Sequence, residues 1–75
     1  MSYATAEVLA YCNFKVKRPS WIEGTYITSK KTIWGTKKVV LYRDNIEQAN
    51  YAPTESDVLA QDWEVIENAT EWINY

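Results

Sequence analysis

Residues 53–63 read Pro-Thr-Glu-Ser-Asp-Val-Leu-Ala-Gln-Asp-Trp, and they join a turn-forming proline, a short helical pattern and a terminal Asp-Trp pair. Thr54 is of a type favoured at helix N-caps, and Asp57 lies three residues later, where its carboxylate can reach free backbone amides. The apolar run 58–60 then gives one short turn an apolar side. This pattern predicts a short helix near the end of the domain, and helix capping alone is one complete interpretation of Asp57.

The residues before this stretch predict a helix followed by strands. Ser2 can cap a helix that extends to about Cys12, and Asn13 is a residue type that ends helices in a left-handed conformation. Strand patterns cover 14–18, 25–34, 37–42 and 46–51, with a turn at 35–36, and a last strand covers 63–66. We therefore expect an α+β fold: a small antiparallel sheet of four to five strands, with an N-terminal helix and a short helix before the last strand.

The chain of 75 residues is long enough for one domain. We place this domain at residues 1–66 and treat 67–75 as a C-terminal extension, whose Trp72, Ile73 and Tyr75 are expected to pack on the domain or on a neighbouring subunit. A chain this short buries only about 60% of its unfolded surface, so a second copy or a ligand would supply further burial. Four tryptophans and six tyrosines either fill a small core or line interfaces and pockets. For Trp63 both interpretations stay open.

Several classes of protein are excluded by what the sequence lacks. There is no histidine, and the single cysteine, Cys12, has no partner for an internal disulfide. Zinc sites of the usual kinds and Ser-His or Cys-His nucleophilic pairs are therefore ruled out. Asp57 and Asp62 have no apparent apolar burial or metal that would separate their pKa values for acid–base work. We predict a protein that is not an enzyme and has no cofactor or metal, and the lack of a signal peptide or membrane-spanning run predicts a cytoplasmic protein without a membrane partner.

Charge is distributed unevenly along the chain. All eight lysines and arginines lie between Lys15 and Arg43, where Glu23 is the one acidic residue, so this segment carries a net charge of +7 while the whole chain carries −2. Such asymmetry fits an anionic ligand held by the basic segment, or electrostatic docking between protomers. A mixed, solvated surface is the simpler alternative, in which the lysines only keep a hairpin soluble.

Two stretches of the sequence resemble a known family. Residues 51–63 are similar to the pattern of the phage Thoeris anti-defence type 2 family, in which an aromatic residue precedes Pro-Ser/Thr-Gln-Ser/Thr-Asp-Leu-Leu-Ala-x-Asp-Trp. The segment Val16-Lys17-Arg18-Pro19-Ser20-Trp21 matches the family's Val-x-Arg-x-x-Trp. Together the two motifs lie at the two ends of residues 3–66. The chain departs from the family at Tyr51-Ala52, where tryptophan is usual, at Asn13, where glycine is usual, and in the longer loop 22–24.

The resemblance implies a function that the residue pattern alone does not. Family members are phage proteins that bind and sequester nucleotide-derived immune signals, such as glyco-cyclic ADP-ribose and in some members cyclic di- or trinucleotides, without cleaving them. They assemble as homotetramers with pockets between protomers. By resemblance we expect an anti-defence protein of the host-cell cytoplasm with a nucleotide second messenger as its ligand and a homotetramer or homodimer as its assembly.

A ligand of this kind needs an aromatic platform for its base, cations or amides for its phosphates, and carboxylates or hydroxyls for its ribose. Under the resemblance we assign Trp21 to stacking, Arg18 to phosphate, and Ser56 with Asp57 to hydroxyl or base-edge hydrogen bonds, while Tyr51 replaces the family's tryptophan. Each assignment has a structural alternative. Arg18 is a surface charge at a strand end, Trp21 anchors a subunit interface, and Asp57 is a helix cap.

Two other functions are compatible with the same residues. A small phage inhibitor would bind a host protein directly through its tryptophans and tyrosines. A single-stranded nucleic-acid surface would use the basic and aromatic segment 15–43. The acidic balance of the whole chain argues against nucleic acid as a partner.

Overall fold

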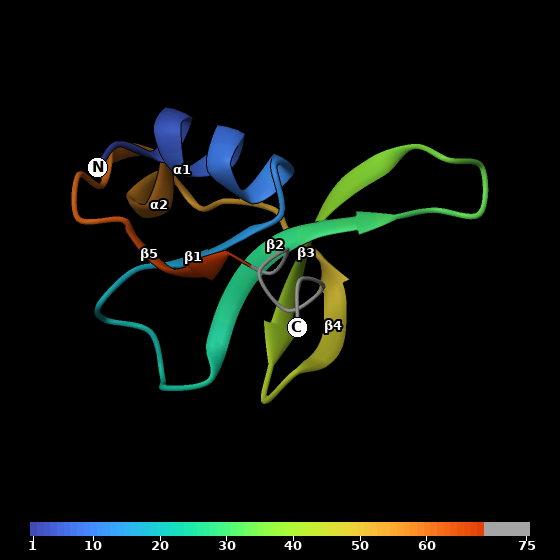
Figure 1. Cartoon of the computed structure of the whole chain (residues 1–75). Coiled ribbons are helices and arrows are strands. Elements are labelled where there is room, and N and C mark those ends of the chain that lie inside the picture. The colour runs from blue at the N-terminus through green and yellow to red at the C-terminus, as the bar shows by residue number, and fades with distance from the viewer. Residues whose placement is uncertain (69–75) are drawn as a thin grey trace.

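The computed structural model describes residues 1–68, and within them the chain forms two helices and a five-stranded sheet (Figure 1). The elements follow one another as α1 (Tyr3–Tyr11), β1 (Phe14–Lys17), β2 (Thr25–Lys31), β3 (Lys37–Arg43), β4 (Ile46–Asn50), α2 (Glu55–Leu59) and β5 (Glu64–Asn68). The sheet has the order β4-β3-β2-β1-β5, and each neighbouring pair is antiparallel. The predicted α+β fold, with one helix at the start and a short one before the last strand, is confirmed.

The bounds of some strands differ from the prediction. The strand expected at 25–34 ends at Lys31, because the backbone turns over residues 32–36: the Thr32 amide donates to the Thr36 carbonyl at 2.7 Å, and Gly35 takes a φ of +83°. β5 begins at Glu64 and continues to Asn68, so the expected domain boundary at residue 66 falls inside this strand. The packing expected for Trp72, Ile73 and Tyr75 lies outside the described residues.

Helix α1 forms where its caps predict. The Ser2 hydroxyl accepts a hydrogen bond from the Thr5 amide at 3.3 Å, and Asn13 ends the helix region with a φ of +73°, as expected for a residue that tolerates this conformation. Ala6 and Ala10 lie one turn apart on the face that meets the sheet, and both are fully buried. Their small side chains let the helix approach the strands closely, so α1 crosses one face of the sheet (Figure 1).

The core lies between α1 and this face of the sheet. Val16 of β1 and Ile27 of β2 are register partners and are both fully buried. Trp63, just before β5, joins them with 2% of its surface exposed, and its indole Nε1 donates to the Asp57 carbonyl at 3.0 Å. Trp63 is therefore a core residue, and its hydrogen bond joins the core to α2.

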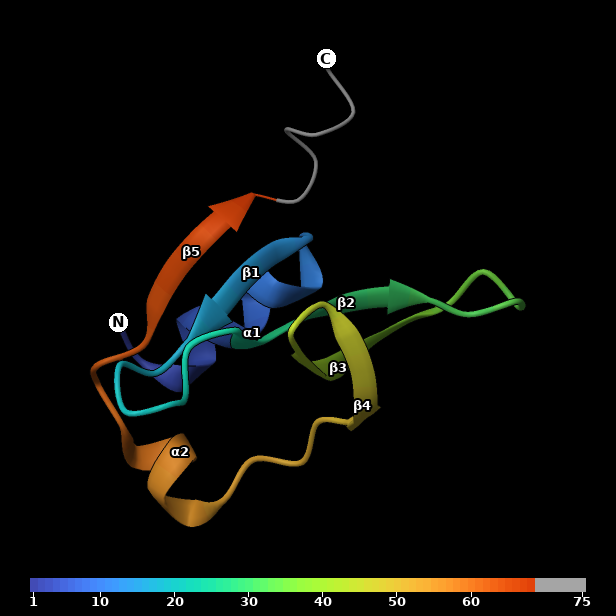
Figure 2. The same cartoon turned by 90° about the horizontal axis from the view of Figure 1, so that it is seen from below.

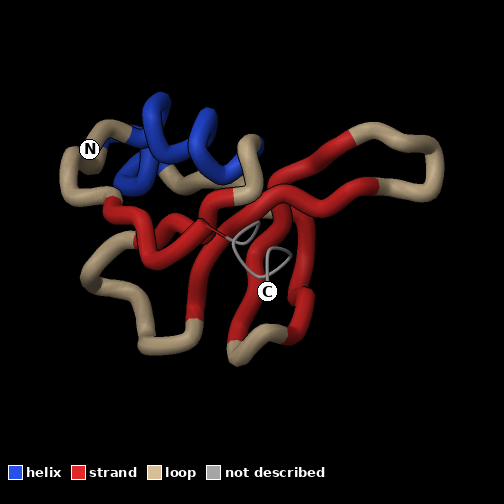
Figure 3. The backbone as a smooth tube through the Cα atoms, viewed as in Figure 1, coloured by secondary structure: helices blue, strands red, loops and turns tan. Residues whose placement is uncertain are grey.

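The end of the β2–β3 hairpin extends beyond the core. Residues 29–38, the hairpin arm, project to the side of the sheet away from α2 (Figures 2 and 3). At its tip Ile33 and Trp34 are 92% and 83% exposed. At its root Lys37 Nζ donates to the Tyr11 carbonyl at 3.3 Å, and Lys30 pairs with Glu47 of β4. The arm is thus anchored at its base, while its largest apolar side chains meet solvent.

Candidate functional site

Helix α2 is fixed by a reciprocal pair of capping bonds. The Asp57 amide donates to Thr54 Oγ1 at 3.2 Å, and the Thr54 amide donates to Asp57 Oδ2 at 3.2 Å. This is the capping box that the sequence predicts. Because both bonds are local, they set the position of the Asp57 carboxylate with respect to the segment that precedes the helix.

Asp57 does more than cap the helix. Its Oδ1 accepts a hydrogen bond from Arg18 Nη1 at 3.1 Å, and its Oδ2 accepts one from the Tyr51 hydroxyl at 2.7 Å. The residue is only 8% exposed. Burial alone would raise the pKa of Asp57, but the hydrogen bonds from Tyr51, Thr54 and Arg18 outweigh burial and hold the pKa below its usual value. Asp57 is therefore an ionised centre that joins the end of β1, the segment after β4 and α2.

Arg18 is already engaged by carboxylates. Besides Asp57, its Nε donates to Asp62 Oδ1 at 3.1 Å, and its Nη1 donates to Ser56 Oγ at 3.2 Å. The hydrogen bonds that Arg18 donates, to Asp57 first and then to Asp62, raise the pKa of Arg18. Its side chain is 18% exposed. The interpretation of Arg18 as a mere surface charge does not fit these contacts, and its predicted role toward phosphate stays a prediction.

Two aromatic rings, Trp21 and Tyr51, pack against the core residue Trp63. The Trp21 ring lies edge-on to Trp63 with centroids 5.2 Å apart, and the Tyr51 ring lies edge-on to Trp63 at 6.4 Å. Trp21 and Tyr51 are themselves 6.0 Å apart. Burial, and then the hydrogen bond to Asp57, raise the pKa of Tyr51 strongly, so this phenol stays protonated and donates. The half-buried rings of Trp21 and Tyr51 thus pack against the buried ring of Trp63.

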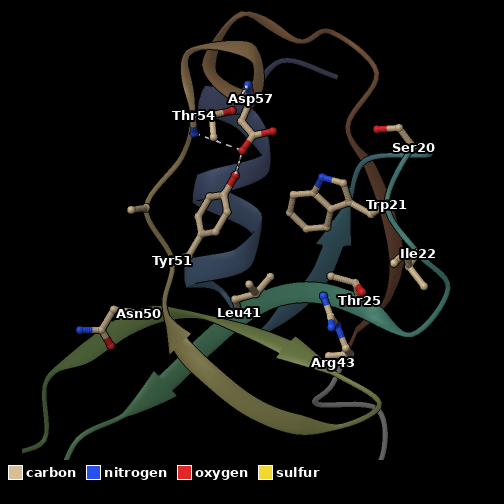
Figure 4. Close-up of a pocket in the computed structure, with 11 residues that line it drawn as sticks. Ser20, Trp21, Ile22, Thr25, Leu41, Arg43, Asn50, Tyr51, Thr54 and Asp57 are labelled. Atoms are coloured by element: carbon tan, nitrogen blue, oxygen red, sulfur yellow. Dashed lines mark hydrogen bonds between the residues drawn. The ribbon is translucent and has the colours of Figure 1, made fainter.

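These rings border a cavity of about 530 Å³, which falls in the size range of small-molecule sites. In Figure 4, Tyr51 and Trp21 lie on opposite sides of the cavity, Asp57 lies at one end, and Thr25 and Arg43 lie at the other. We call it the Trp21–Tyr51 pocket, and its lining is Ser20, Trp21, Ile22, Thr25, Leu41, Arg43, Asn50, Tyr51, Ala52, Thr54 and Asp57. The pocket therefore offers aromatic walls with polar groups at both ends.

The far end of the pocket is built by the β2–β3 ladder. Thr25 begins β2 and Arg43 ends β3, and the two are register partners. Thr25 is 8% exposed, and its Oγ1 has no hydrogen-bond partner among residues 1–68. The exposed Arg43 makes no ion pair or side-chain hydrogen bond within the same residues, and in Figure 4 its guanidinium points from the strand toward Thr25 and the cavity. A buried hydroxyl and an uncompensated cation thus stand side by side.

The structure brings all five predicted site residues together, but not all of them line the pocket. Trp21, Tyr51 and Asp57 do, whereas Arg18 and Ser56 contact each other outside the lining, with Arg18 bound to Asp57. Sequence reasoning missed Thr25, Leu41 and Arg43. Thr25 and Arg43 lie at the open ends of one hairpin, but the tight turn predicted at 35–36 would place Thr25 opposite Ile46. The wider turn over 32–36 sets the register that pairs Thr25 with Arg43.

The family model for the Thoeris anti-defense 2-like domain matches residues 1–66. The chain belongs to this family. A comparison with curated proteins finds no match. Family membership gives the protein a Thoeris anti-defence role and points to a non-catalytic one.

Residues 1–68 contain neither a membrane-spanning helix nor a cluster of metal ligands. Neither helix is long and apolar enough to cross a membrane. Within residues 1–68 no group of three or more Cys, Asp or Glu side chains is placed so that it could hold a metal ion.

Proposed function

We propose that this protein counters Thoeris defence by binding a nucleotide-derived immune signal, such as glyco-cyclic ADP-ribose or a cyclic oligonucleotide, in the Trp21–Tyr51 pocket and holding it without cleavage. The observation that carries the proposal is the pocket itself, with two aromatic walls, an ionised carboxylate at one end and a guanidinium at the other. This is the set of groups that base, ribose and phosphate require. The protein would act in the cytoplasm of the infected host cell.

The hydrogen bonds around Asp57 suit a ribose hydroxyl or a base edge. An ionised carboxylate accepts hydrogen bonds and does not donate them, and each of its oxygens has two lone pairs. Oδ2 already accepts from the Tyr51 hydroxyl and the Thr54 amide, whereas within residues 1–68 Oδ1 accepts from Arg18 alone. A ligand hydroxyl or amino group would therefore donate to Oδ1. Binding of this kind removes the signal from solution, and sequestration needs no chemistry beyond it.

The assembly we propose is a homodimer or homotetramer, in which the hairpin arm contacts a second copy. Ile33 and Trp34 at the tip are large apolar side chains left in solvent, which is typical of contact surfaces. At the root of the arm lies a second hollow, of about 400 Å³, lined by Glu7, Val8, Tyr11, Cys12 and Val39. If two arms lie antiparallel, each tip reaches the partner's hollow, and lysines of the arm approach Glu7.

Direct inhibition of a host protein is the second candidate function, and the exposed tip of the arm favours it. The two functions separate in one experiment. A sequestering protein binds purified nucleotide with no other protein present, whereas an inhibitor binds its target protein and leaves the nucleotide free.

Calorimetric titration with glyco-cyclic ADP-ribose tests the primary proposal. Trp21→Ala removes one wall of the pocket, and we expect an affinity loss of roughly tenfold or more, since stacking of one base contributes about 1–3 kcal/mol. Ile66→Ala is the control, because Ile66 is a large exposed apolar residue outside both this pocket and the hollow at the root of the arm. Equal affinity of the two variants for the nucleotide would contradict the proposed site.

A further inference from the structure

We infer that Arg43 and Thr25, and not Arg18, recognise the anionic group of the ligand, so that the far end of the Trp21–Tyr51 pocket selects nucleotides that carry phosphate. Arg18 is then a positioning residue that holds Asp57 and α2 in place. The inference rests on the proposed function, since it names the residues that recognise one chemical group of the same ligand.

Arg18 is poorly placed to bind phosphate. Its guanidinium donates to two carboxylates and one hydroxyl, and it does not line the cavity. Turning it toward a ligand would break the contact with Asp57 and leave a nearly buried carboxylate without its cation, which is strongly unfavourable. The positive charge of Arg18 is therefore already paired with Asp57 and Asp62.

Arg43 has the opposite environment. It lines the cavity, and it has no ion pair or side-chain hydrogen bond in the part of the chain that the structure describes. Its backbone is held from both sides, because β3 pairs it with Thr25 of β2 and with Ile46 of β4. A guanidinium presents several donors in a fixed plane and binds phosphate oxygens in pairs. Arg43 thus has a backbone held in the sheet and a guanidinium that no carboxylate in residues 1–68 neutralises.

Thr25 supplies a second, independent observation. Its hydroxyl is buried and unpartnered beside the cavity, and a buried polar group without a partner destabilises the folded protein. A ligand oxygen next to Arg43 would provide the missing partner, because Thr25 and Arg43 are register partners on adjacent strands. Thr28 also carries a buried, unpartnered hydroxyl, but it does not line the pocket. Three residues along the strand, Thr28 points to the opposite face, so it serves as an internal control.

The test is calorimetric titration of glyco-cyclic ADP-ribose at several salt concentrations. Arg43→Gln is expected to weaken binding by roughly 10–100-fold and to reduce its salt dependence, because one charge pair with the phosphate is lost. Lys38→Gln removes the same charge from the same strand, but its side chain alternates to the other face, so we expect affinity within about twofold of the native protein. Arg18→Gln is expected to weaken binding while the salt dependence keeps its native slope. Loss of a residue that itself binds the phosphate would reduce that slope.

Variants of the two threonines give a second test. Thr25→Val keeps the shape of the side chain, and we expect it to weaken binding by roughly tenfold while the melting temperature stays equal or rises. Thr28→Val should leave affinity unchanged with the same effect on melting. The inference is overturned if Arg43→Gln binds as the native protein does, or if Arg18→Gln is the variant that flattens the salt dependence. Failure of the native protein itself to bind the nucleotide would instead contradict the proposed function.

Discussion

The two ends of this molecule use aromatic residues in opposite ways. At the pocket end, Trp63 is buried and Trp21 and Tyr51 are packed against it, with Asp57 joining three segments by hydrogen bonds. In the hairpin arm, Trp34 makes no ring contact with the described residues and lies in solvent. The same residue type therefore stabilises the fold at one end and lies in solvent at the other, where we propose that it contacts a second copy. This contrast predicts a steep gradient of mutational effects along the chain.

The largest effect on stability is expected at Trp63. Trp63→Ala removes a nearly fully buried ring and its hydrogen bond to the Asp57 carbonyl. Such a change costs about 3–5 kcal/mol, a large share of the stability of a small domain. Trp34→Ala is the matched control, with an expected change within about 0.5 kcal/mol. Urea unfolding followed by circular dichroism measures both, and similar losses for the two variants would remove the contrast.

A smaller loss is expected at Asp57. Asp57→Ala leaves the Tyr51 hydroxyl and the Thr54 amide without their acceptor, and so removes one of the two bonds of the capping box, at a cost of about 1–3 kcal/mol. Glu55→Ala changes a carboxylate in the same turn of α2 that is exposed, and it should have little effect. The difference between the two variants reports the hydrogen bonds of Asp57 rather than the charge of the helix.

The pH dependence of stability gives a separate test of Asp57. Its pKa in the folded protein lies below the ordinary value of 3.8, so below about that pH the unfolded chain binds a proton before the folded one does. The contribution of Asp57 to the free energy of unfolding is therefore fully present at pH values above the ordinary pKa. It is lost as the pH falls through the lower pKa of the folded state. Asp57→Asn should flatten this part of the acid unfolding curve. An unchanged acid limb in the variant would show that Asp57 is not held ionised by its partners.

The smallest effect on stability, with a clear effect on assembly, is expected in the arm. Ile33→Cys places a thiol at the exposed tip, and the one native cysteine, Cys12, is exposed in the hollow at the root of the arm. If two arms lie antiparallel, mild oxidation should give a covalent dimer through these two positions. The control carries Cys12→Ser as well and should stay monomeric on a non-reducing gel. Cross-linking that persists in the control would show that the tip does not meet the hollow.

Local signals in the sequence predicted the ends of the helices well. The capping box of Thr54 and Asp57 and the left-handed Asn13 depend on neighbouring residues, and all of these are confirmed. Thr25 and Arg43 escaped prediction because they meet through strand register, which joins residues far apart in the sequence. For Arg18 the sequence showed a cation beside Trp21, but not that Asp57 and Asp62 already share its charge.

The arm was predicted as a hairpin with a tight turn at 35–36, and the structure has a wider turn over 32–36. Hydroxyl contacts between Thr32 and Thr36 support this wider turn, and the strand pattern of residues 25–34 gave no sign of them. Trp63 could be read as a core or an interface residue, since both environments favour tryptophan. Its burial became evident only when α1 and β5 were placed in space.

The most direct test of the central claim is recovery of the ligand. The purified protein is mixed with glyco-cyclic ADP-ribose, freed of unbound nucleotide, denatured by heat, and the supernatant is measured by mass spectrometry. We predict chemically unchanged nucleotide, released in a fixed ratio to protein, and much less of it from Trp21→Ala than from Ile66→Ala. Cleaved nucleotide would contradict sequestration without chemistry, and no retained nucleotide in the native protein would contradict the pocket as a site for this signal.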